Sequence, residues 1–323
     1  MLKNYLKITF RSLWKSKVFV LVNIIGMGLA IACSIVAYLN YDFNINFDSN
    51  QTNTDNIYRI DGERVYQNRK QVYGISPLPL SAAVKDNVGD ISDVLRYIPS
   101  GGNFKVADEL FNENFTFVDP IFFDFFYFNI TEGDVNALKD KSNIIISSTV
   151  VEKYFPQGDA LGKTLTHFMS SGNKDYKVAA IFDDHPMNSS FGGVQIITVI
   201  DNFFDLQNAS KEDADVRHEN NWSAWTTSFV KVEDPSRVKD IERRLTENYI
   251  EIQNNARLDF KLDKYTLEPF EGMAHRAADD QVWSHRLRSS MPPPAVFVPG
   301  IMAILILLIA CFNFTNTSMA IAS

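Results

Sequence analysis

Two long stretches without a charged residue stand out in the pattern of hydrophobic and polar positions. The first is residues 18–41, VFVLVNIIGMGLAIACSIVAYLNY, and the second is residues 295–320, with the core VPGIMAILILLIACFNF. At about 1.5 Å per residue, the first stretch forms a helix about 36 Å long, enough to cross a hydrocarbon core of about 30 Å. We predict a transmembrane helix over each stretch, with Pro292, Pro293 and Pro294 as an extended lead-in and Pro299 in an early turn.

The region between the two stretches, residues 42–294, alternates short strand patterns with helical ones, which is typical of an α+β domain. We predict two subdomains in it. The expected strands are Ile57–Tyr66, Lys70–Ile75, Ile91–Ile98, Leu110–Val118, Asn143–Ser147, Tyr176–Phe182, Trp225–Val232 and Leu258–Leu267. The expected helices are Pro77–Val88 with Ser76 as N-cap, Pro120–Phe126 with Asp119 as N-cap, Ser148–Tyr154 and Pro235–Gln253. The predicted fold class is thus two transmembrane helices that flank a large α+β extracytoplasmic domain.

The first seventeen residues carry five basic side chains and no acidic one. Basic residues beside a first span favour a cytoplasmic N-terminus, which places residues 42–294 outside the membrane. Hydrophobic residues at helical spacing within residues 1–17 predict an amphipathic leader helix on the inner leaflet. A secretory signal peptide is the alternative, with Ala30-Ile31-Ala32 as a cleavage site or Cys33 as a lipid attachment site, but the apolar run is longer than such a signal needs.

Charge and cysteine content argue against several classes of function. Of the 323 residues, all 39 acidic residues and 26 of the 31 basic ones lie between Asp42 and Arg288, a net charge of −13. A nucleic-acid-binding protein of this size usually carries a basic face, so this balance argues against one. The two cysteines, Cys33 and Cys311, both fall in the predicted spans. The exported domain can therefore form neither a disulfide nor a cysteine zinc cluster.

The segment Gly158–Thr164 resembles a phosphate-binding loop, but three residues separate its glycines where that loop needs four. The residues shortly before this segment are Tyr154-Phe155-Pro156, which is not a strand pattern. We predict a turn followed by a strand here, and no nucleotide site.

Two groups of side chains could hold a metal ion. One is Asp183-Asp184-His185, which stands before Pro186 and favours a solvated turn. The other is His275 with Asp279, Asp280 and His285, which lacks the i, i+4 histidine pair of a helical zinc site. We predict no catalytic, cofactor-binding or metal-binding residues and no cofactor. The aromatic run Phe122–Phe128 is predicted to be core.

In the first span, Gly26, Ala30 and Ser34 fall at i, i+4 and i+8. Small residues on one face of a membrane helix let another helix approach closely, so we predict that this face packs against a helix.

Several short stretches, in order along the chain, resemble the N-terminal half-repeat of MacB-like (FtsX-like) ABC transporter permeases. The stretches are Lys3–Ile8, Arg11–Lys15, Asn23–Gly26, Phe47-Asp48, Asn56–Ile60, Asp119–Phe128, Glu152–Pro156, Ala160–Leu165, Tyr176–Pro186, Asn188-Ser189 and Leu307–Asn316.

The resemblance implies a permease of the bacterial inner membrane that has no catalytic residues and is driven by a cytoplasmic ABC ATPase. It implies export of peptides, antibiotics or lipoproteins by a homodimer or a paired permease, with a periplasmic adaptor and an outer-membrane channel as further partners. Family members continue into at least two more spans, and no charged residue follows Arg288, so we expect this chain to be the front part of a longer permease. The alternative function is a membrane-anchored extracytoplasmic sensor or receptor.

Overall fold

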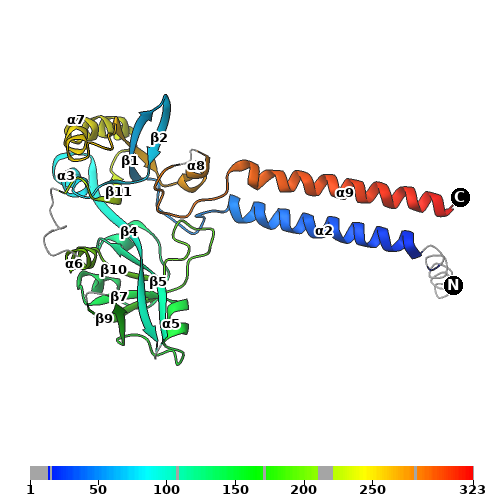
Figure 1. The fold of residues 1–323 in the computed structure, drawn as a ribbon, viewed down its shortest axis with the longest axis horizontal. Coiled ribbons are helices and arrows are strands. Elements are labelled where there is room, and N and C mark those ends of the chain that lie inside the picture. Colours follow the sequence, from blue (N-terminus) through cyan, green and yellow to red (C-terminus); the bar gives the residue numbers. More distant parts are fainter. Residues whose placement is uncertain are drawn as a thin grey trace. The chain divides into compact units, whose positions relative to one another are not determined.

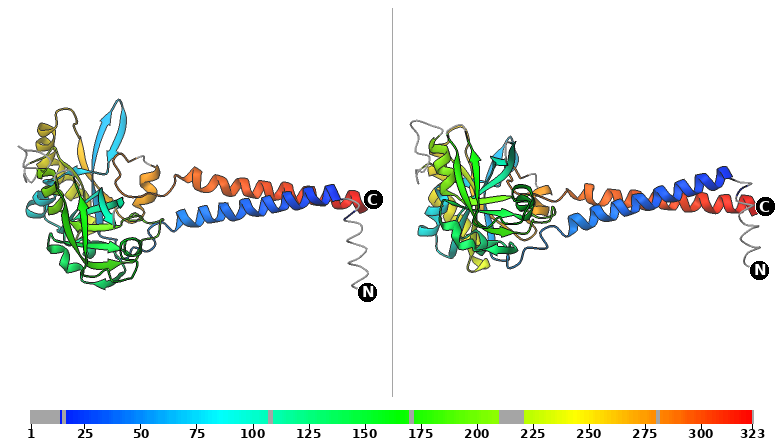
Figure 2. Two further views of the ribbon diagram at one scale, coloured as in Figure 1. Left: turned by 60° about the horizontal axis from the view of Figure 1, so that its bottom comes forward. Right: turned by 90° about the horizontal axis from the view of Figure 1, so that it is seen from below.

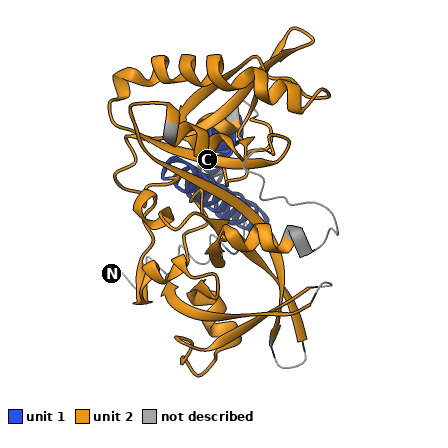
Figure 3. Ribbon diagram, turned by 90° about the vertical axis from the view of Figure 1, so that its left-hand side faces the viewer, with its two compact units in different colours: residues 1–46, 291–323 blue, residues 47–290 orange. Residues whose placement is uncertain are grey.

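The computed structural model describes residues 14, 17–106, 109–169, 172–209, 221–279 and 282–322. The predicted leader helix, residues 1–17, lies almost wholly outside the described residues. The chain divides into two compact units (Figure 3). We call Met1–Asn46 with Met291–Ser323 the helix unit, and Phe47–Ser290 the sheet unit.

The helix unit contains two long helices, α2 (Lys17–Ile45) and α9 (Pro293–Ala322), which lie side by side and run in opposite directions (Figures 1 and 2). Both are long and apolar enough to cross a membrane, so the two predicted spans are confirmed as helices and extend beyond the predicted ends. The extended lead-in predicted for the prolines is wrong in part, because α9 begins at Pro293. The first turn of a helix needs no backbone N–H donor, which is why Pro293 and Pro294 fit there.

The sheet unit is built from strands and shorter helices in alternation, as the α+β prediction requires. The strands are β1 (Ile57–Tyr66), β2 (Arg69–Tyr73), β3 (Ser76–Pro77), β4 (Ile91–Val106), β5 (Glu109–Val118), β6 (Ile130–Gly133), β7 (Asn143–Ser147), β8 (Thr164–Phe168), β9 (Lys174–Phe182), β10 (Ile196–Val199), β11 (Trp225–Val232) and β12 (Lys264–Pro269). The helices are α3 (Leu80–Asn87), α4 (Phe122–Phe125), α5 (Ser148–Tyr154), α6 (Asp201–Ala209), α7 (Val238–Ala256) and α8 (Met273–Asp279), with 3₁₀ turns η1 (Val135–Lys139) and η2 (Pro235–Arg237).

The described strands join in one mixed sheet with the order β12-β1-β11-β4-β5-β10-β7-β9-β6. Strand β2 pairs with β1, β3 with β11, and β8 with both β4 and β9. Strand β4 holds the two halves of the sheet together: its first part pairs with β11 from Ile91 to Tyr97, and its second part pairs with β5 from Tyr97 to Val106. The long strand can be followed between these neighbours in Figure 1.

Three hydrophobic clusters form the core of the sheet unit. One packs α3 and α7 against β1 and β12, a second packs α5 and α6 against β5, β7 and β9, and the third lies around the phenylalanine-rich segment at α4. Ile241, Leu245 and Tyr249 are buried and form the apolar face of α7. The aromatic run is core as predicted, with Phe122, Phe125, Phe126 and Phe128 buried and Tyr127 exposed.

Several predicted elements are wrong at their boundaries, and three of them show the physical reason. Ser76 does not cap a helix, because Ser76-Pro77 pairs with β11 and the Ser76 hydroxyl donates to Ser228 Oγ at 2.8 Å. Asp119 does not cap α4, which begins at Phe122, because its carboxylate binds Arg96. The strand predicted from Leu258 begins only at Lys264. The Asn254 side chain accepts from the Leu262 N–H and donates to its carbonyl, which folds that loop back onto α7.

Candidate functional site

The contact between α2 and α9 uses one residue every seven positions on each helix, and most of these residues are small. Ala30, Ala37 and Asn44 are buried on α2, and Val296, Ala303 and Ala310 are buried on α9. A repeat of seven residues corresponds to 3.5 residues per turn, the period of a left-handed helix pair. Small side chains at these positions let the two backbones approach each other.

A side chain from α2 repairs a gap in the hydrogen bonding of α9. Pro299 lies inside α9 and has no N–H, so the Ala295 carbonyl four residues earlier has no donor within the helix. The Asn40 amide donates to this carbonyl at 3.1 Å, and also lies 3.4 Å from the Val296 carbonyl. Within a bilayer a freed carbonyl must find such a partner, so this contact fixes where the two helices meet.

Asn44, one turn further along α2, continues the same connection. Its side chain is buried, donates to the Asn40 carbonyl at 2.8 Å and accepts from the Met291 N–H at 2.7 Å. The Asn40–Asn44 pair therefore joins the end of α2 to the start of α9 through side-chain bonds.

The predicted packing residues Gly26, Ala30 and Ser34 have different surroundings. Ala30 is fully buried against α9, whereas Gly26 and Ser34 are half-buried. The Ser34 hydroxyl donates to the Ala30 carbonyl at 2.8 Å, and a Cβ added at Gly26 would have no atom within 4 Å. Close packing of another helix at Gly26 stays a prediction.

The first residues of the sheet unit are bound to the loop between β9 and β10. We call residues 185–192 the anchor loop. Asp48 accepts hydrogen bonds from the Ser189 hydroxyl (3.1 Å), the Ser190 N–H (2.6 Å) and the Ser190 hydroxyl (2.6 Å). Burial raises the pKa of the Asp48 carboxyl, although these hydrogen bonds act in the opposite direction by favouring its charged form.

The last residues of the sheet unit bind the same loop. The Arg288 N–H donates to the Ser190 carbonyl at 3.2 Å, and Arg288 Nε donates to the Met187 carbonyl at 3.2 Å. Gly192 makes this possible, because a Cβ there would lie 3.0 Å from Arg288 Cδ and 2.9 Å from the Pro186 carbonyl oxygen. Both chain ends of the sheet unit are thus tied to the anchor loop.

The first candidate metal group, Asp183-Asp184-His185, serves the fold. Asp184 caps α5 by accepting from the Thr149 N–H and hydroxyl, each at 2.8 Å, and Asp183 accepts from the Asn129 amide. His185 is buried against the Phe128 ring, and its Nδ1 accepts from the Asn50 amide at 2.8 Å. Burial lowers the pKa of His185 to about 4, so this imidazole is neutral near pH 7.

In the second candidate group, the two described histidines bind different partners. His275 Nδ1 binds the Ser290 hydroxyl at 2.9 Å, and His285 Nδ1 faces the buried Arg59 guanidinium at 2.5 Å. Asp280 and the Asp279 side chain lie outside the described residues. In the described part of the chain, no three His, Cys, Asp or Glu side chains are placed to share a metal ion.

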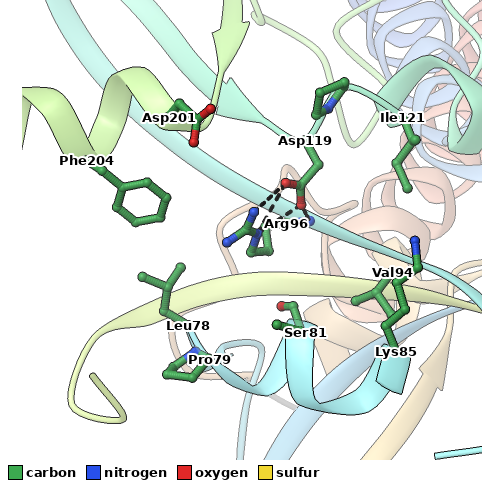
Figure 4. Close-up of a pocket in the computed structure, with 12 residues that line it drawn as sticks. Leu78, Pro79, Ser81, Lys85, Val94, Arg96, Asp119, Ile121, Asp201 and Phe204 are labelled. Atoms are coloured by element: carbon green, nitrogen blue, oxygen red, sulfur yellow. Dashed lines mark hydrogen bonds and ion pairs between the residues drawn. The ribbon is translucent and has the colours of Figure 1, made fainter. Parts of the chain in front are cut away.

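A cleft of about 510 Å³ lies in the sheet unit between α3, β4, α6 and the turn before α4 (Figure 4). Across its floor, Arg96 Nη2 donates to Asp119 Oδ1 at 2.6 Å and Arg96 Nε donates to Asp119 Oδ2 at 3.0 Å. The other charged lining residues are Lys85 and Asp201. The Ser81 hydroxyl in this cleft forms a hydrogen bond with Ser228 Oγ at 2.9 Å.

The glycine-rich segment before β8 forms a turn followed by a strand, as predicted. Gly158 and Gly162 both have positive φ, and Lys163 pairs with Asp159 at 3.0 Å on the surface. A strand follows Lys163 where a phosphate-binding loop would lead into a helix.

Comparison with known proteins identifies the family. The family described as the MacB-like periplasmic core domain matches residues 20–248, from within α2 to within α7. The chain belongs to this family. Its members include the periplasmic part of ABC-type permeases, and this MacB-like chain accordingly carries such a domain between two helices able to span a membrane.

Three solved structures resemble this MacB-like chain. A domain of a permease protein from Porphyromonas gingivalis has a TM-score of 0.50 and 18% identity, covering 68% of this chain and 92% of that one. The periplasmic region of MacB from Actinobacillus actinomycetemcomitans has a TM-score of 0.46 and 13% identity, covering 68% and 91%. The extracellular domain of the noncanonic ABC-type transporter YknZ from Gram-positive bacteria has a TM-score of 0.44 and 13% identity, covering 66% and 99%. A search of curated proteins found no match.

Sequence reasoning missed the residues that tie this MacB-like chain together. The seven-residue repeat of Ala30, Ala37 and Asn44 was visible in the sequence, and so was the four-residue spacing of Asn40 and Asn44. Their partners lie about 250 positions away, at the start of α9, and no local pattern points to them.

Proposed function

We propose that this chain is a permease subunit of a MacB-type ABC transporter, which couples ATP hydrolysis by a cytoplasmic partner to export or other work outside the membrane. The observation that carries the proposal is the family match over residues 20–248, in a chain with two apolar helices that contact each other. The alternative function, a membrane-anchored sensor or receptor, does not require that the chain belong to this family.

The hydrogen bonds described above support a mechanical role. Asn40 and Asn44 join α2 to α9, so the two helices move together as a pair. Within the sheet unit, Asp48 at one chain end and Arg288 at the other both bind the anchor loop. A displacement of either end therefore acts on one loop, which lies between strands β9 and β10 of the sheet.

The orientation and the partners are parts of the same proposal. The five basic residues before the first span favour a cytoplasmic N-terminus in the bacterial inner membrane, which leaves the sheet unit outside. The proposed ATPase then acts on the cytoplasmic side of the membrane. Peptides, antibiotics or lipoproteins are the proposed cargo, and a second permease copy, an adaptor and an outer-membrane channel are the proposed further partners.

The test is purification of the full chain from membranes of its own bacterium after mild cross-linking, followed by mass spectrometry and ATPase assays. We expect an ABC ATPase to co-purify, and its ATPase activity to depend on the permease chain. Asp48→Ala should lower this dependence more than Asp159→Ala, because Asp159 is exposed and far in sequence from the anchor loop. Recovery of a histidine kinase in place of the ATPase would overturn the proposal.

A sensor or receptor is the second candidate, and the cleft around Arg96 favours it. Its volume of about 510 Å³ falls within the range of about 300–1,000 Å³ that is usual for small-molecule sites. A receptor would bind its ligand without any ATPase, so ligand-induced stabilisation that is unchanged by ATPase depletion would support this function.

A further inference from the structure

A second cavity of the sheet unit has an unusual charge. We call it the arginine pocket. It has a volume of about 260 Å³ and lies between the end of the anchor loop, the β4–β5 hairpin and the segment that leaves the sheet unit. Its polar lining includes Ser100, Asn114, Ser190, His285, Arg286 and Arg288.

The charge of the arginine pocket is opposite to that of its surroundings. Residues 42–288 carry a net charge of −13, yet none of the described residues that line the pocket is acidic. The carboxylate bonded to its wall is that of Asp48, and Ser189 and Ser190 already occupy its oxygens. Arg286 and Arg288 therefore line this cavity, and none of its other described lining residues carries a carboxylate.

Arg286 is the residue that most needs a ligand. Its guanidinium has no hydrogen bond or ion pair with any described residue and is half-buried, and burial lowers the pKa of Arg286 below its usual value. Several other arginines of this unit pair with a carboxylate, as Arg59 does with Asp61 and Arg96 with Asp119. A partly desolvated cation without a partner is costly, and an anion in the pocket would offset that cost.

Arg288 is held in a fixed position beside it. Its stem crosses the loop at Gly192, and Nε donates to the Met187 carbonyl, which leaves its terminal nitrogens without a protein partner in the described residues. On the opposite side, the Asn114 amide donates to the Gly193 carbonyl at 2.7 Å and so fixes the loop at the pocket wall. Hydrogen bonds thus hold Arg288 and the loop beside it in place at the pocket.

We propose that the arginine pocket binds a phosphate group. Planar guanidinium groups donate two hydrogen bonds each and match phosphate oxygens closely. The volume is below the usual range for drug-sized ligands, and therefore fits a headgroup or a small phosphate compound.

Two sources could supply the phosphate. Arg288 precedes the apolar helix α9 by only five residues, and basic residues so close in sequence to a span commonly meet lipid headgroups. With the orientation proposed above, these arginines stand on the exported side, where the positive-inside bias gives no reason for them. A soluble phosphate compound is the other source, and the experiment separates the two.

The test measures the melting temperature of the full chain in detergent without phosphate. Inorganic phosphate, short-chain phosphatidylglycerol or short-chain phosphatidylcholine is added, with sodium chloride at matched ionic strength as the screening control. We expect a saturable rise that exceeds the salt effect. A rise with phosphatidylglycerol alone assigns the pocket to a lipid headgroup, and a rise with inorganic phosphate alone assigns it to a soluble compound.

Substitutions of the pocket arginines test whether phosphate binds in this pocket. Arg286→Gln should weaken the apparent affinity at least about tenfold, because it removes a charge-assisted hydrogen bond, and Arg286→Lys should weaken it less. Arg243→Gln is the matched control, since Arg243 lies on α7 and pairs with Asp240 and Glu247. If Arg286→Gln does not fold, Arg288→Gln takes its place, because Arg288 is exposed.

Three results would overturn the proposal. The first is no response beyond that of sodium chloride. The second is an unchanged affinity in Arg286→Gln. The third is an equal response to phosphatidylcholine and phosphatidylglycerol that Arg286→Gln leaves intact, which would mean that acyl chains bind elsewhere.

Discussion

Both the backbone conformation and the side-chain hydrogen bonds of Asp48 restrict which residue can stand at this position. It has a positive φ of 59°, a conformation that aspartate and asparagine tolerate better than most residues, and its carboxylate accepts three hydrogen bonds from the anchor loop. We expect Asp48→Ala to lower the free energy of unfolding of residues 47–290 by about 2–3 kcal/mol, because it leaves buried donors unpaired and strains the backbone. Thermal and urea unfolding measure this.

Two variants make the result specific. Asp48→Asn keeps one acceptor oxygen and tolerates the same φ, so it should cost clearly less than alanine. Asp159→Ala should change stability by no more than about 0.5 kcal/mol, because its side chain is 75% exposed and its pairing with Lys163 is a surface contact. Equal losses in Asp48→Ala and Asp159→Ala would contradict the role of Asp48.

Two buried histidines and one half-buried histidine make the stability of the sheet unit depend on pH. Burial lowers the pKa of His167, His185 and His285 to about 4, and the Arg59 charge adds to the effect at His285. The unfolded chain takes up these protons near pH 6.5 and the folded chain does not. Stability is therefore full above about pH 6.5 and falls as the pH drops towards 4.

Asp48 and Asp61 act in the opposite sense, because burial raises their pKa and the folded state takes up their protons first. We expect the three histidines to dominate between pH 6.5 and 4, so that the melting temperature falls across this range. His185→Gln should make the pH dependence shallower. A slope identical to that of the wild type would show that His185 is not among the groups responsible.

At the scale of elements, the Asn40 bond to α9 depends on Pro299. We predict that Asn40→Ala destabilises the α2–α9 pair by about 1 kcal/mol, in the range of interhelical hydrogen bonds in membranes. In a Pro299→Ala background the same change should cost less, because the new N–H at position 299 can serve the Ala295 carbonyl. Unfolding of the full chain in detergent, as a double-mutant cycle, measures the coupling.

Leu39→Ala is the matched control for this cycle, since Leu39 lies beside Asn40 and is 58% exposed. It should show no coupling to Pro299. If the Asn40 and Pro299 effects simply add, the carbonyl of Ala295 has another partner and the interpretation is wrong.

Gly26 gives a separate prediction about helix packing. Since no atom lies within 4 Å of a Cβ placed there, Gly26→Leu should leave the α2–α9 pair intact, whereas Ala30→Leu should disrupt it. If Gly26→Leu still weakens assembly of permease copies, measured by cross-linking in membranes, the helix that packs at Gly26 comes from outside this pair. Equal tolerance of Gly26→Leu and Leu21→Ala would mean that this face meets lipid.

The sequence predicted well those elements with a strong local pattern. Strands Ile57–Tyr66, Asn143–Ser147 and Trp225–Val232 and the helix Ser148–Tyr154 match the structure to the residue. Strands β6 and β10 were missed, because four residues are too few to show an alternation. Helices α6 and α8 were missed as well.

The candidate sites were far less predictable. Arg96 meets Asp119 and Asp48 meets Ser190 because distant strands and loops come together, and spacing along the chain carries no trace of it. Serine before proline favours a helix cap locally, which is why the sequence predicts that role for Ser76, but in the structure Ser76 pairs with β11 instead. The arginine pocket was invisible in the sequence, since its residues come from three separate segments.

At the scale of the whole molecule, the proposed function requires the sheet unit to lie outside the cytoplasm. Five basic residues precede the first span without an acidic one, and a long following domain crosses the membrane largely regardless of its own charge. Gln157→Cys tests this in a chain with Cys33→Ser and Cys311→Ser, because Gln157 is exposed in the turn before β8. In cells with a permeabilised outer membrane, a membrane-impermeant maleimide should label this cysteine while the inner membrane is intact. Ser12→Cys, in the basic segment, should be labelled only after the inner membrane is opened. The reverse pattern would place the sheet unit in the cytoplasm and remove the basis for an exported permease domain.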